Sequence, residues 1–405
     1  MPVAKKIADF TQRSSWIRQM FEEGARLAEI HGRDRVYDFS IGNPNVEPPQ
    51  EFQRVIEELA SDRTAGMHGY MANAGYQETR AAVAMYLSQD QGVPLSADHI
   101  VMTCGAAGAI NVAFKAILDP LDEVIVSRPY FVEYGFHVDN HGGVLKPVSS
   151  GAGFDLDIGA IDAAIGPKTR AVLVNSPNNP TGRIYPGESL RALGDLLRRK
   201  CRDTGRVIYL LSDEPYRRIA YDGHRVPPIM AAYENTILAT SYSKELSLPG
   251  ERIGYLAANP SIPRVKDLME GLILANRILG FVNAPALMQR AVARLQGLGV
   301  DVAPYQRNRD VLWQALAESG FEVFKPEGAF YLFPRSPIED DVAFVRELQE
   351  HLVLAVPGSG FGLPGYFRLA FCVAPEVVDG ALPAFRAVGA KYYGPFEPGR
   401  GASGP

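Results

Sequence analysis

The chain has 405 residues, of which 46% are hydrophobic and 21% charged, and its formal net charge is −5 at pH 7. These values are typical of a globular protein of about two or three domains. The mild acidity argues against a general nucleic-acid or membrane-surface binder, and no apolar run approaches the roughly 20 residues of a membrane-spanning helix. The basic N-terminal segment is followed by no apolar stretch, so no signal peptide is expected. Three distant cysteines without a CxxC pair favour a reducing cytoplasm over a disulfide framework or a zinc site.

The first predicted elements are an amphipathic helix over residues 14–31 and a turn-rich crossing segment over 44–49. From residue 99 onward, short β-branched runs that are apolar at their centres alternate with helical patterns, which is typical of a parallel sheet buried on both faces. The six runs are 99–103, 124–127, 171–175, 207–211, 236–240 and 253–257. The clearest helices between them are 108–117 and 188–199. We therefore predict an α/β domain with a mostly parallel sheet.

The C-terminal part mixes helices and strands without this alternation. Helices are predicted over 283–298, 305–319, 341–352 and 375–388, and strands over 328–333 and 367–373. This pattern favours a second, smaller α+β domain. Residues 391–405 contain seven Gly or Pro residues, so a flexible tail is predicted there.

The candidate site residues follow the strands, because ligands of open parallel sheets bind beyond the carboxyl ends of the strands. After the first run, Gly105, Ala106 and Ala107 are small enough for backbone N–H groups at a helix start to approach an anion. Later runs are followed by Phe131, a flat aromatic that can stack on a planar ligand, and by Asn179, an amide donor. Each has a structural alternative: close helix packing, an apolar core position or an ordinary turn.

The last three strand ends add ionisable groups. Asp213 and Tyr216 follow the fourth run, where a semi-buried carboxylate needs a cationic or donor partner. Lys244 follows the fifth run and Arg252 precedes the sixth; desolvation lowers the pKa of a lysine and makes it a nucleophile or base. Taken singly, Asp213 is equally well a helix N-cap and Lys244 a solvated surface group.

Together these residues match the needs of pyridoxal phosphate, a planar aldehyde with a phosphate and a ring nitrogen that forms a Schiff base with lysine. From about residue 38 to about residue 388, the chain resembles the fold-type I aminotransferases of class I/II, the broad aspartate aminotransferase family. The motifs that carry the resemblance are Asn179-Pro180-Thr181-Gly182, Asp213-Glu214-Pro215-Tyr216, Ser241-Tyr242-Ser243-Lys244 with Arg252, and Phe367-Arg368-Leu369.

The resemblance implies a fold and a domain division. It implies a three-layer α/β large domain with a mostly parallel mixed sheet over residues 46–285. A smaller α+β domain would be discontinuous and comprise residues 1–45 and 286–390, before the tail at 391–405.

The resemblance also implies residue roles. Lys244 would form the Schiff base and move protons, and Asp213 would pair with the pyridine nitrogen. Tyr216 would adjust the pKa of the imine. The residues implied in holding the cofactor are Gly105, Ala106, Ala107, Phe131, Asn179, Asp213, Tyr216, Ser241, Lys244 and Arg252. Tyr70 resembles the tyrosine that reaches the phosphate in the neighbouring subunit, which would require a homodimer. Gly42, Asn179 and Arg368 would bind the substrate, with Arg368 on its α-carboxylate. Residues 105–107, which would form the anion cradle for the phosphate, have no hydroxyl side chains. The cradle must therefore rely more on backbone N–H groups.

The function so implied is a cytoplasmic, ping-pong aminotransferase that moves the amino group of an L-amino acid to a 2-oxo acid such as 2-oxoglutarate. Aspartate is the first expectation, but the distal-carboxylate arginine of dicarboxylate specialists falls on Ile278, with Arg277 beside it, so alanine and aromatic donors stay open. A C–S β-lyase on the same fold is the second reading, and a non-catalytic ligand-binding regulator the third. No metal site is predicted: His137 and His141 have helical spacing, but a solvated helix end explains them better.

Overall fold

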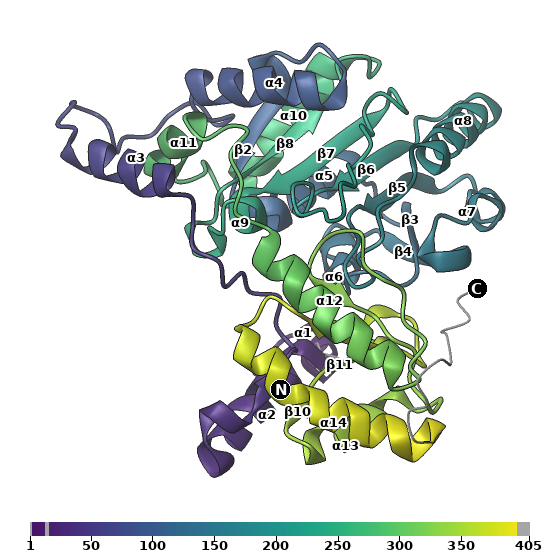
Figure 1. Ribbon diagram of the computed structural model, residues 1–405. Coiled ribbons are helices and arrows are strands. Elements are labelled where there is room, and N and C mark those ends of the chain that lie inside the picture. Colours follow the sequence, from purple (N-terminus) through teal and green to yellow (C-terminus); the bar gives the residue numbers. More distant parts are fainter. Residues whose placement is uncertain (1, 13–15, 395–405) are drawn as a thin grey trace.

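The computed structural model describes residues 2–12 and 16–394, and its centre is a seven-stranded sheet of order β2-β8-β7-β6-β5-β3-β4 (Figure 1). The strands are β2 (Ile100–Thr103), β3 (Glu123–Ser127), β4 (Val144–Val148), β5 (Thr169–Asn175), β6 (Tyr209–Asp213), β7 (Thr236–Ser241) and β8 (Gly254–Ala258). Strand β8 runs antiparallel to β2 and β7, whereas the other neighbours are parallel. The predicted mostly parallel mixed sheet is confirmed.

In the central sheet, β4 is an unpredicted strand, β5 begins two residues before the predicted run 171–175, and β6 is shifted. Strand β4 was not predicted, because this edge strand includes Lys146 and Pro147 and lacks a continuous apolar centre. Strand β6 begins and ends two residues later than the predicted run 207–211, so Asp213 is its last residue instead of lying in the following loop. The shift places the Asp213 carboxylate at the buried end of the sheet.

Helices cover both faces of the sheet. On one face, α5 (Gly105–Ile117), α6 (Glu133–Asp139) and α10 (Val265–Ile278) share an apolar core with β2, β3 and β5 to β8. On the other face, α3 (Gln50–Ser61), α4 (Gln77–Gln91) and α11 (Ala286–Ala293) pack against β2, β7 and β8. There, α7 (Ile158–Ala164) and α8 (Gly187–Thr204) cover β3 to β6. A single turn, α9 (Tyr242–Glu245), follows β7.

The C-terminal part lies below the sheet in Figure 1 and has its own apolar core. It contains α12 (Ala303–Glu318), α13 (Asp341–Glu350) and α14 (Pro375–Tyr393), and a three-stranded sheet of β9 (Tyr331–Leu332), β11 (Val356–Pro357) and β12 (Phe367–Ala370). N-terminal residues join it, because β1 (Tyr37–Asp38) pairs with β10 (Val353–Leu354). Helices α1 (Lys5–Gln12) and α2 (Trp16–His31) lie on the same side. Short 3-10 helices occupy Arg33–Arg35, Ala97–His99, Ala152–Phe154, Pro249–Glu251 and Gly358–Phe361.

Two boundaries differ from the predicted ones. Helix α11 packs in the same core as α3 and α4, although the boundary at residue 285 assigned it to the small domain. Helix α14 continues to Tyr393, because Tyr392 and Tyr393 pack on Phe344 and Phe321, so residues 391–393 are not a loose tail. The rest of that tail, 395–405, and residues 14–15 of the first predicted helix lie outside the described residues. The division into two domains otherwise stays a prediction.

Within 2–12 and 16–394, no helix is long and apolar enough to cross a membrane. In the same residues, no group of three or more His, Cys, Asp or Glu side chains has the arrangement of a metal site.

Candidate active site

A cavity of about 310 Å³ lies where the carboxyl ends of the parallel strands meet the C-terminal part. Eleven of the predicted site residues line it: Gly42, Ala106, Ala107, Phe131, Asn179, Asp213, Tyr216, Ser241, Lys244, Arg252 and Arg368. These residues come from segments more than 300 positions apart in the chain. The fold therefore brings nearly the whole predicted set into one cavity.

Helix α5 begins at the cavity wall with the predicted anion cradle. Gly105, its first residue, has a φ of +75°, a conformation that L-residues with a side chain rarely adopt. A Cβ at this position would lie 3.0 Å from an Nη atom of Arg252. The absence of side chains thus lets the Arg252 guanidinium approach the free N–H groups at the start of α5, and both favour an anion.

Asp213 ends β6 in a fully buried position. Its Oδ2 accepts a 2.6 Å hydrogen bond from the Tyr134 hydroxyl, whereas Oδ1 is buried without a partner among the described residues. Burial raises the pKa of Asp213 to about 7, and the Tyr134 hydrogen bond acts in the opposite direction. A carboxylate left in this state is stabilised by a cationic N–H donor placed against Oδ1.

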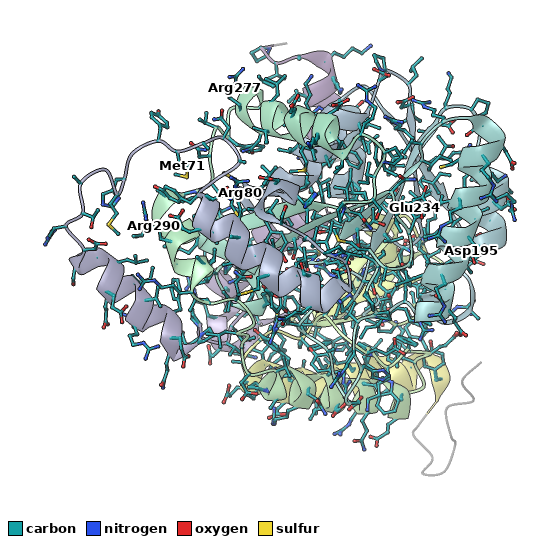
Figure 2. All side chains as sticks on the ribbon, turned by 90° about the horizontal axis from the view of Figure 1, so that it is seen from above. Met71, Arg80, Asp195, Glu234, Arg277 and Arg290 are labelled. Atoms are coloured by element: carbon teal, nitrogen blue, oxygen red, sulfur yellow. The ribbon has the colours of Figure 1, made fainter. Side chains whose placement is uncertain are left out.

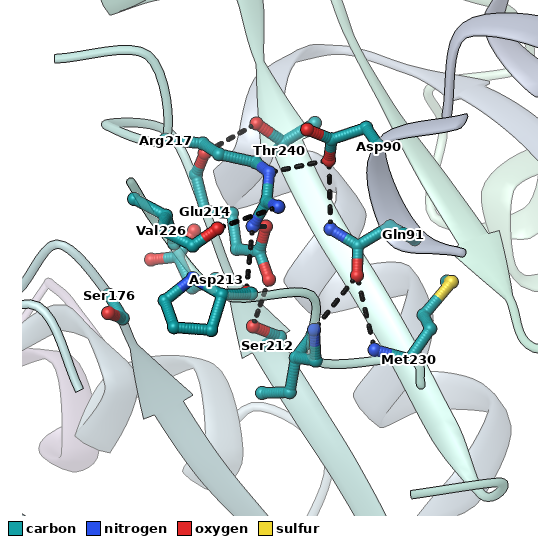
Figure 3. A network of polar contacts seen from close by, with 12 residues as sticks. Asp90, Gln91, Ser176, Ser212, Asp213, Glu214, Arg217, Val226, Met230 and Thr240 are labelled. Atoms are coloured by element: carbon teal, nitrogen blue, oxygen red, sulfur yellow. Dashed lines mark hydrogen bonds and ion pairs between the residues drawn. The ribbon is translucent and has the colours of Figure 1, made fainter. Parts of the chain in front are cut away.

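A polar network fixes the residue after Asp213 (Figure 3). The buried Glu214 carboxylate accepts from Ser212 at 2.7 Å and from Arg217 at 2.9 Å. Arg217 also forms an ion pair with Asp90 at 2.6 Å, and Gln91 donates to the same Asp90 oxygen at 3.1 Å. These contacts hold the turn that connects Asp213 to Tyr216.

Lys244 enters the cavity from α9. Its Nζ donates a 2.8 Å hydrogen bond to the backbone carbonyl of Gly42, and it lies 5.5 Å from the centre of the Phe330 ring. Burial lowers the pKa of Lys244 to about 8, and the charges of Arg368 and Arg252 add to this effect. The amine of Lys244 therefore loses its proton more readily than that of an ordinary lysine, and the neutral form is nucleophilic.

Arg368 reaches the cavity from β12 on the opposite side. Its Nη1 donates to Asn179 Oδ1 at 3.2 Å, its Nη2 donates to the backbone carbonyl of Ser40, and its Nε is buried without a partner among the described residues. The guanidinium lies over the Tyr331 ring at 4.6 Å, and the Tyr331 hydroxyl is 2.8 Å from that of Tyr216. A buried guanidinium held in this way can bind a carboxylate.

Three positions singled out in the sequence do not line this cavity. Gly105 precedes the lining residues Ala106 and Ala107 at the start of α5. Tyr70 is 94% exposed and belongs to none of the walls of the cavity in its own chain. Arg277 is exposed on α10 at the molecular surface (Figure 2) and does not line the cavity either. Among the described residues, neither Tyr70 nor Arg277 lines the site of its own subunit.

Four cavity residues were missed or misread by the sequence analysis. Tyr134 lies three positions after Phe131 on one helical turn, and Asn175 pairs in register with Asp213 across β5 and β6, so both had a local signal. Tyr331 had none, because only the tertiary fold brings β9 to the site. His137 was expected at a solvated helix end, but it is half-buried and lines the cavity, because α6 packs against α5 at this point.

The polar groups that line the cavity fit pyridoxal phosphate. The orphaned Asp213 Oδ1 matches a protonated ring nitrogen, the start of α5 with Arg252 matches a phosphate, and the low-pKa Lys244 matches an aldehyde. Phe131 contributes a flat aromatic ring to the lining of the same cavity. The same cavity contains Arg368 for the carboxylate of a second ligand.

Comparisons with known proteins agree with this geometry. The family model for aminotransferase class I and II matches residues 34–385. A solved amino transferase from Eubacterium rectale is 41% identical with a TM-score of 0.94, and the match covers 97% of this chain and 100% of that one. The aspartate/prephenate aminotransferase of Thermus thermophilus is 33% identical over 86% of this chain and 90% of its own. The solved aspartate aminotransferase of Thermus thermophilus with maleate is 28% identical, with a TM-score of 0.82 over 92% of this chain and 96% of that one.

Members of this family depend on pyridoxal phosphate, which confirms the predicted cofactor class. One cavity contains a buried carboxylate, a lysine and an arginine, and the family model matches most of the chain. The chain therefore belongs to the class I and II aminotransferases and is a transaminase of fold type I.

Proposed function

We propose that the protein is a homodimeric, cytoplasmic aspartate aminotransferase that uses 2-oxoglutarate as amino acceptor. The observation that carries the proposal is the Asp213 carboxylate, whose one oxygen is held by Tyr134 while the other is buried and free, in a cavity shared with Lys244 and Arg368. The names of the similar aspartate aminotransferases support aspartate as donor.

Each residue has a task in this reaction. When bound, pyridoxal phosphate supplies a ring that withdraws electrons from the α-carbon of the amino acid. Asp213 would keep a proton on the ring nitrogen through its free oxygen, and Lys244 would accept and return the α-proton as a neutral amine. Arg368 would hold the α-carboxylate through its free N–H groups, with Asn179 and Gly42 beside it. Tyr216 would donate to the phenolic oxygen of the ring.

The cofactor residues divide into an anion end and a ring end. The backbone of Gly105, Ala106 and Ala107 holds the phosphate together with Ser241 and Arg252. Phe131 stacks on the ring.

The partner subunit completes the site in this proposal. Tyr70 projects from the surface with 94% of its area exposed, so its ring is accessible to a partner subunit. In a homodimer, Tyr70 of the partner subunit would reach the phosphate of the cofactor. Arg277, also exposed, is the candidate contact for the distal carboxylate of a dicarboxylic substrate from across the same interface.

The test combines a variant and a substrate panel. The purified protein should show the visible absorbance band of the cofactor, and Lys244→Ala should abolish transamination while the fold is retained. A panel of aspartate, alanine and aromatic donors with 2-oxoglutarate, followed through that band, identifies the donor. Transamination by Lys244→Ala, or a wild-type protein without the band, would contradict the proposal. Pyruvate release from cystathionine without any oxo acid would instead indicate a β-lyase.

A further inference from the structure

His137 is a titratable cavity residue that the proposed reaction does not use. It lies on α6, one turn after Tyr134, so the two side chains share a helical face. Tyr134 holds Asp213, and His137, one turn further along α6, contacts Asn111 of α5.

Asn111 fixes the orientation of the His137 ring. This residue lies one turn after Ala107 on α5, and its Nδ2 donates to the Ala107 carbonyl at 2.9 Å. A carbonyl only accepts, so the amide group facing Ala107 must be the NH₂. The same Nδ2 lies 3.0 Å from His137 Nδ1, and Asn111 Oδ1 lies 3.3 Å from His141 Nε2. The Asn111 amide therefore donates to His137 and accepts from His141.

The tautomer of His137 follows from this contact. Because Nδ1 accepts a hydrogen bond from Asn111, the proton of the neutral ring resides on Nε2. Burial lowers the pKa of His137 to about 4, and the nearby His141 adds to the effect, so the ring is neutral near neutral pH. Nε2 has no hydrogen-bond partner within the described part of the chain, and the ring lines the cavity.

The first three residues of α5 offer no side-chain donor of their own. The anion cradle of Gly105, Ala106 and Ala107 has no hydroxyl side chain, and Ala107 is the residue to which Asn111 connects His137. We propose that His137 is an additional cofactor-binding residue whose Nε2–H donates a hydrogen bond to the phosphate group of pyridoxal phosphate. This inference rests on the proposed cofactor site and deepens it, because α6 then adds a side-chain donor to those of Ser241 and Arg252.

Two conservative variants separate the donor from the packing. Asparagine at position 137 reproduces a polar group at the Nδ1 position, and so retains the contact with Asn111, but does not reach the Nε2 position. Glutamine places an NH₂ near the Nε2 position. Both are small, uncharged and polar, so the α5–α6 contact should survive in each. The comparison between His137→Asn and His137→Gln therefore reports on the Nε2–H donor.

The measurement is the dissociation constant of pyridoxal phosphate, obtained by diluting the holoprotein and following the visible band of the cofactor. We expect His137→Asn to raise this constant about tenfold, as for loss of a hydrogen bond to a charged group, and His137→Gln to stay within about threefold of wild type. Reconstitution with pyridoxal, which lacks the phosphate, is the control, and its affinity should be the same in wild type and His137→Asn.

The outcomes distinguish this inference from the proposed function. If wild type binds pyridoxal phosphate and His137→Asn binds it equally well, His137 does not hold the phosphate. If His137→Asn weakens pyridoxal and pyridoxal phosphate alike, the residue only packs the wall, and the inference is again wrong. A wild-type protein that binds no pyridoxal phosphate would instead overturn the proposed cofactor site itself. If His137→Asn fails to fold, the ³¹P resonance of the cofactor phosphate is compared between the wild-type holoprotein and His137→Gln. We expect the phosphorus signal to shift between the two proteins, and an unchanged signal would contradict the inference.

Discussion

The substitution Asp213→Asn tests two contributions to the free energy of unfolding. One is the cost of burying the Asp213 carboxylate, and the other is its pairing with the ring nitrogen of the cofactor. In the cofactor-free protein, burial raises the pKa of Asp213 from 3.8 to about 7. Between these two values the folded protein binds more protons than the unfolded chain, so its stability falls as the pH rises through this window. Asparagine does not ionise and still offers an oxygen to the Tyr134 hydroxyl. The variant should therefore lack this component of the pH dependence.

The magnitude follows from the shift. One pKa unit corresponds to about 1.4 kcal/mol. The rise of the Asp213 pKa from 3.8 to about 7 thus amounts to about 4 kcal/mol once the pH exceeds the folded value. Between about pH 5 and pH 8, cofactor-free wild type should lose about 2.5 kcal/mol of unfolding free energy that the variant keeps.

The assay is urea unfolding of both proteins without cofactor at several pH values in this range. Lys244 and Glu245 also have perturbed pKa values, but they are present in both proteins and cancel in the comparison. With pyridoxal phosphate bound, wild type should be more stable to unfolding than Asp213→Asn, because the ring nitrogen then pairs with the carboxylate. Parallel pH profiles for the two cofactor-free proteins would refute the reasoning about burial. A holoprotein variant as stable as wild type would refute the pairing.

Two further variants test the neighbouring contacts. Arg368→Lys should raise the KM for the amino acid about tenfold or more with a smaller change in kcat, because lysine lacks the planar pair of N–H donors that holds a carboxylate; steady-state kinetics that show an unchanged KM would contradict this role. Tyr134→Phe removes the donor to Asp213 Oδ2 and should raise the pKa of that carboxyl further. The dissociation constant of pyridoxal phosphate should then increase about tenfold at neutral pH, and an unchanged constant at every pH would show that the hydroxyl does not hold Asp213.

Most of the candidate site was predictable because each residue follows a strand or belongs to a compact motif. Lys244, Asp213 and Asn179 come directly at or after the ends of buried parallel strands, and those ends meet at one edge of the sheet. Arg368 was predicted from its motif, and the fold brings it to Asn179 at 3.2 Å. The local pattern therefore contained both the identity of these residues and their side of the sheet.

The contacts that sequence reasoning missed join separate elements of the fold. The Tyr134–Asp213 bond joins positions 79 residues apart, and the Tyr216–Tyr331 contact joins positions 115 apart. His137 and Asn111 lie on two helices whose packing no periodicity predicts. Likewise, the core shared by α11 with α3 and α4 could not be read from the segment around residue 285.

The sequence by itself determined the family, the alternation of strands and helices in the central part of the chain and the chemical groups of the site, because these depend on local patterns and motifs. The tertiary structure decided how those groups are tuned. Burial raises the pKa of Asp213 and lowers that of Lys244, and one Asp213 oxygen is occupied while the other stays free. These properties arise from desolvation and from contacts between distant segments, and both exist only once the chain is packed.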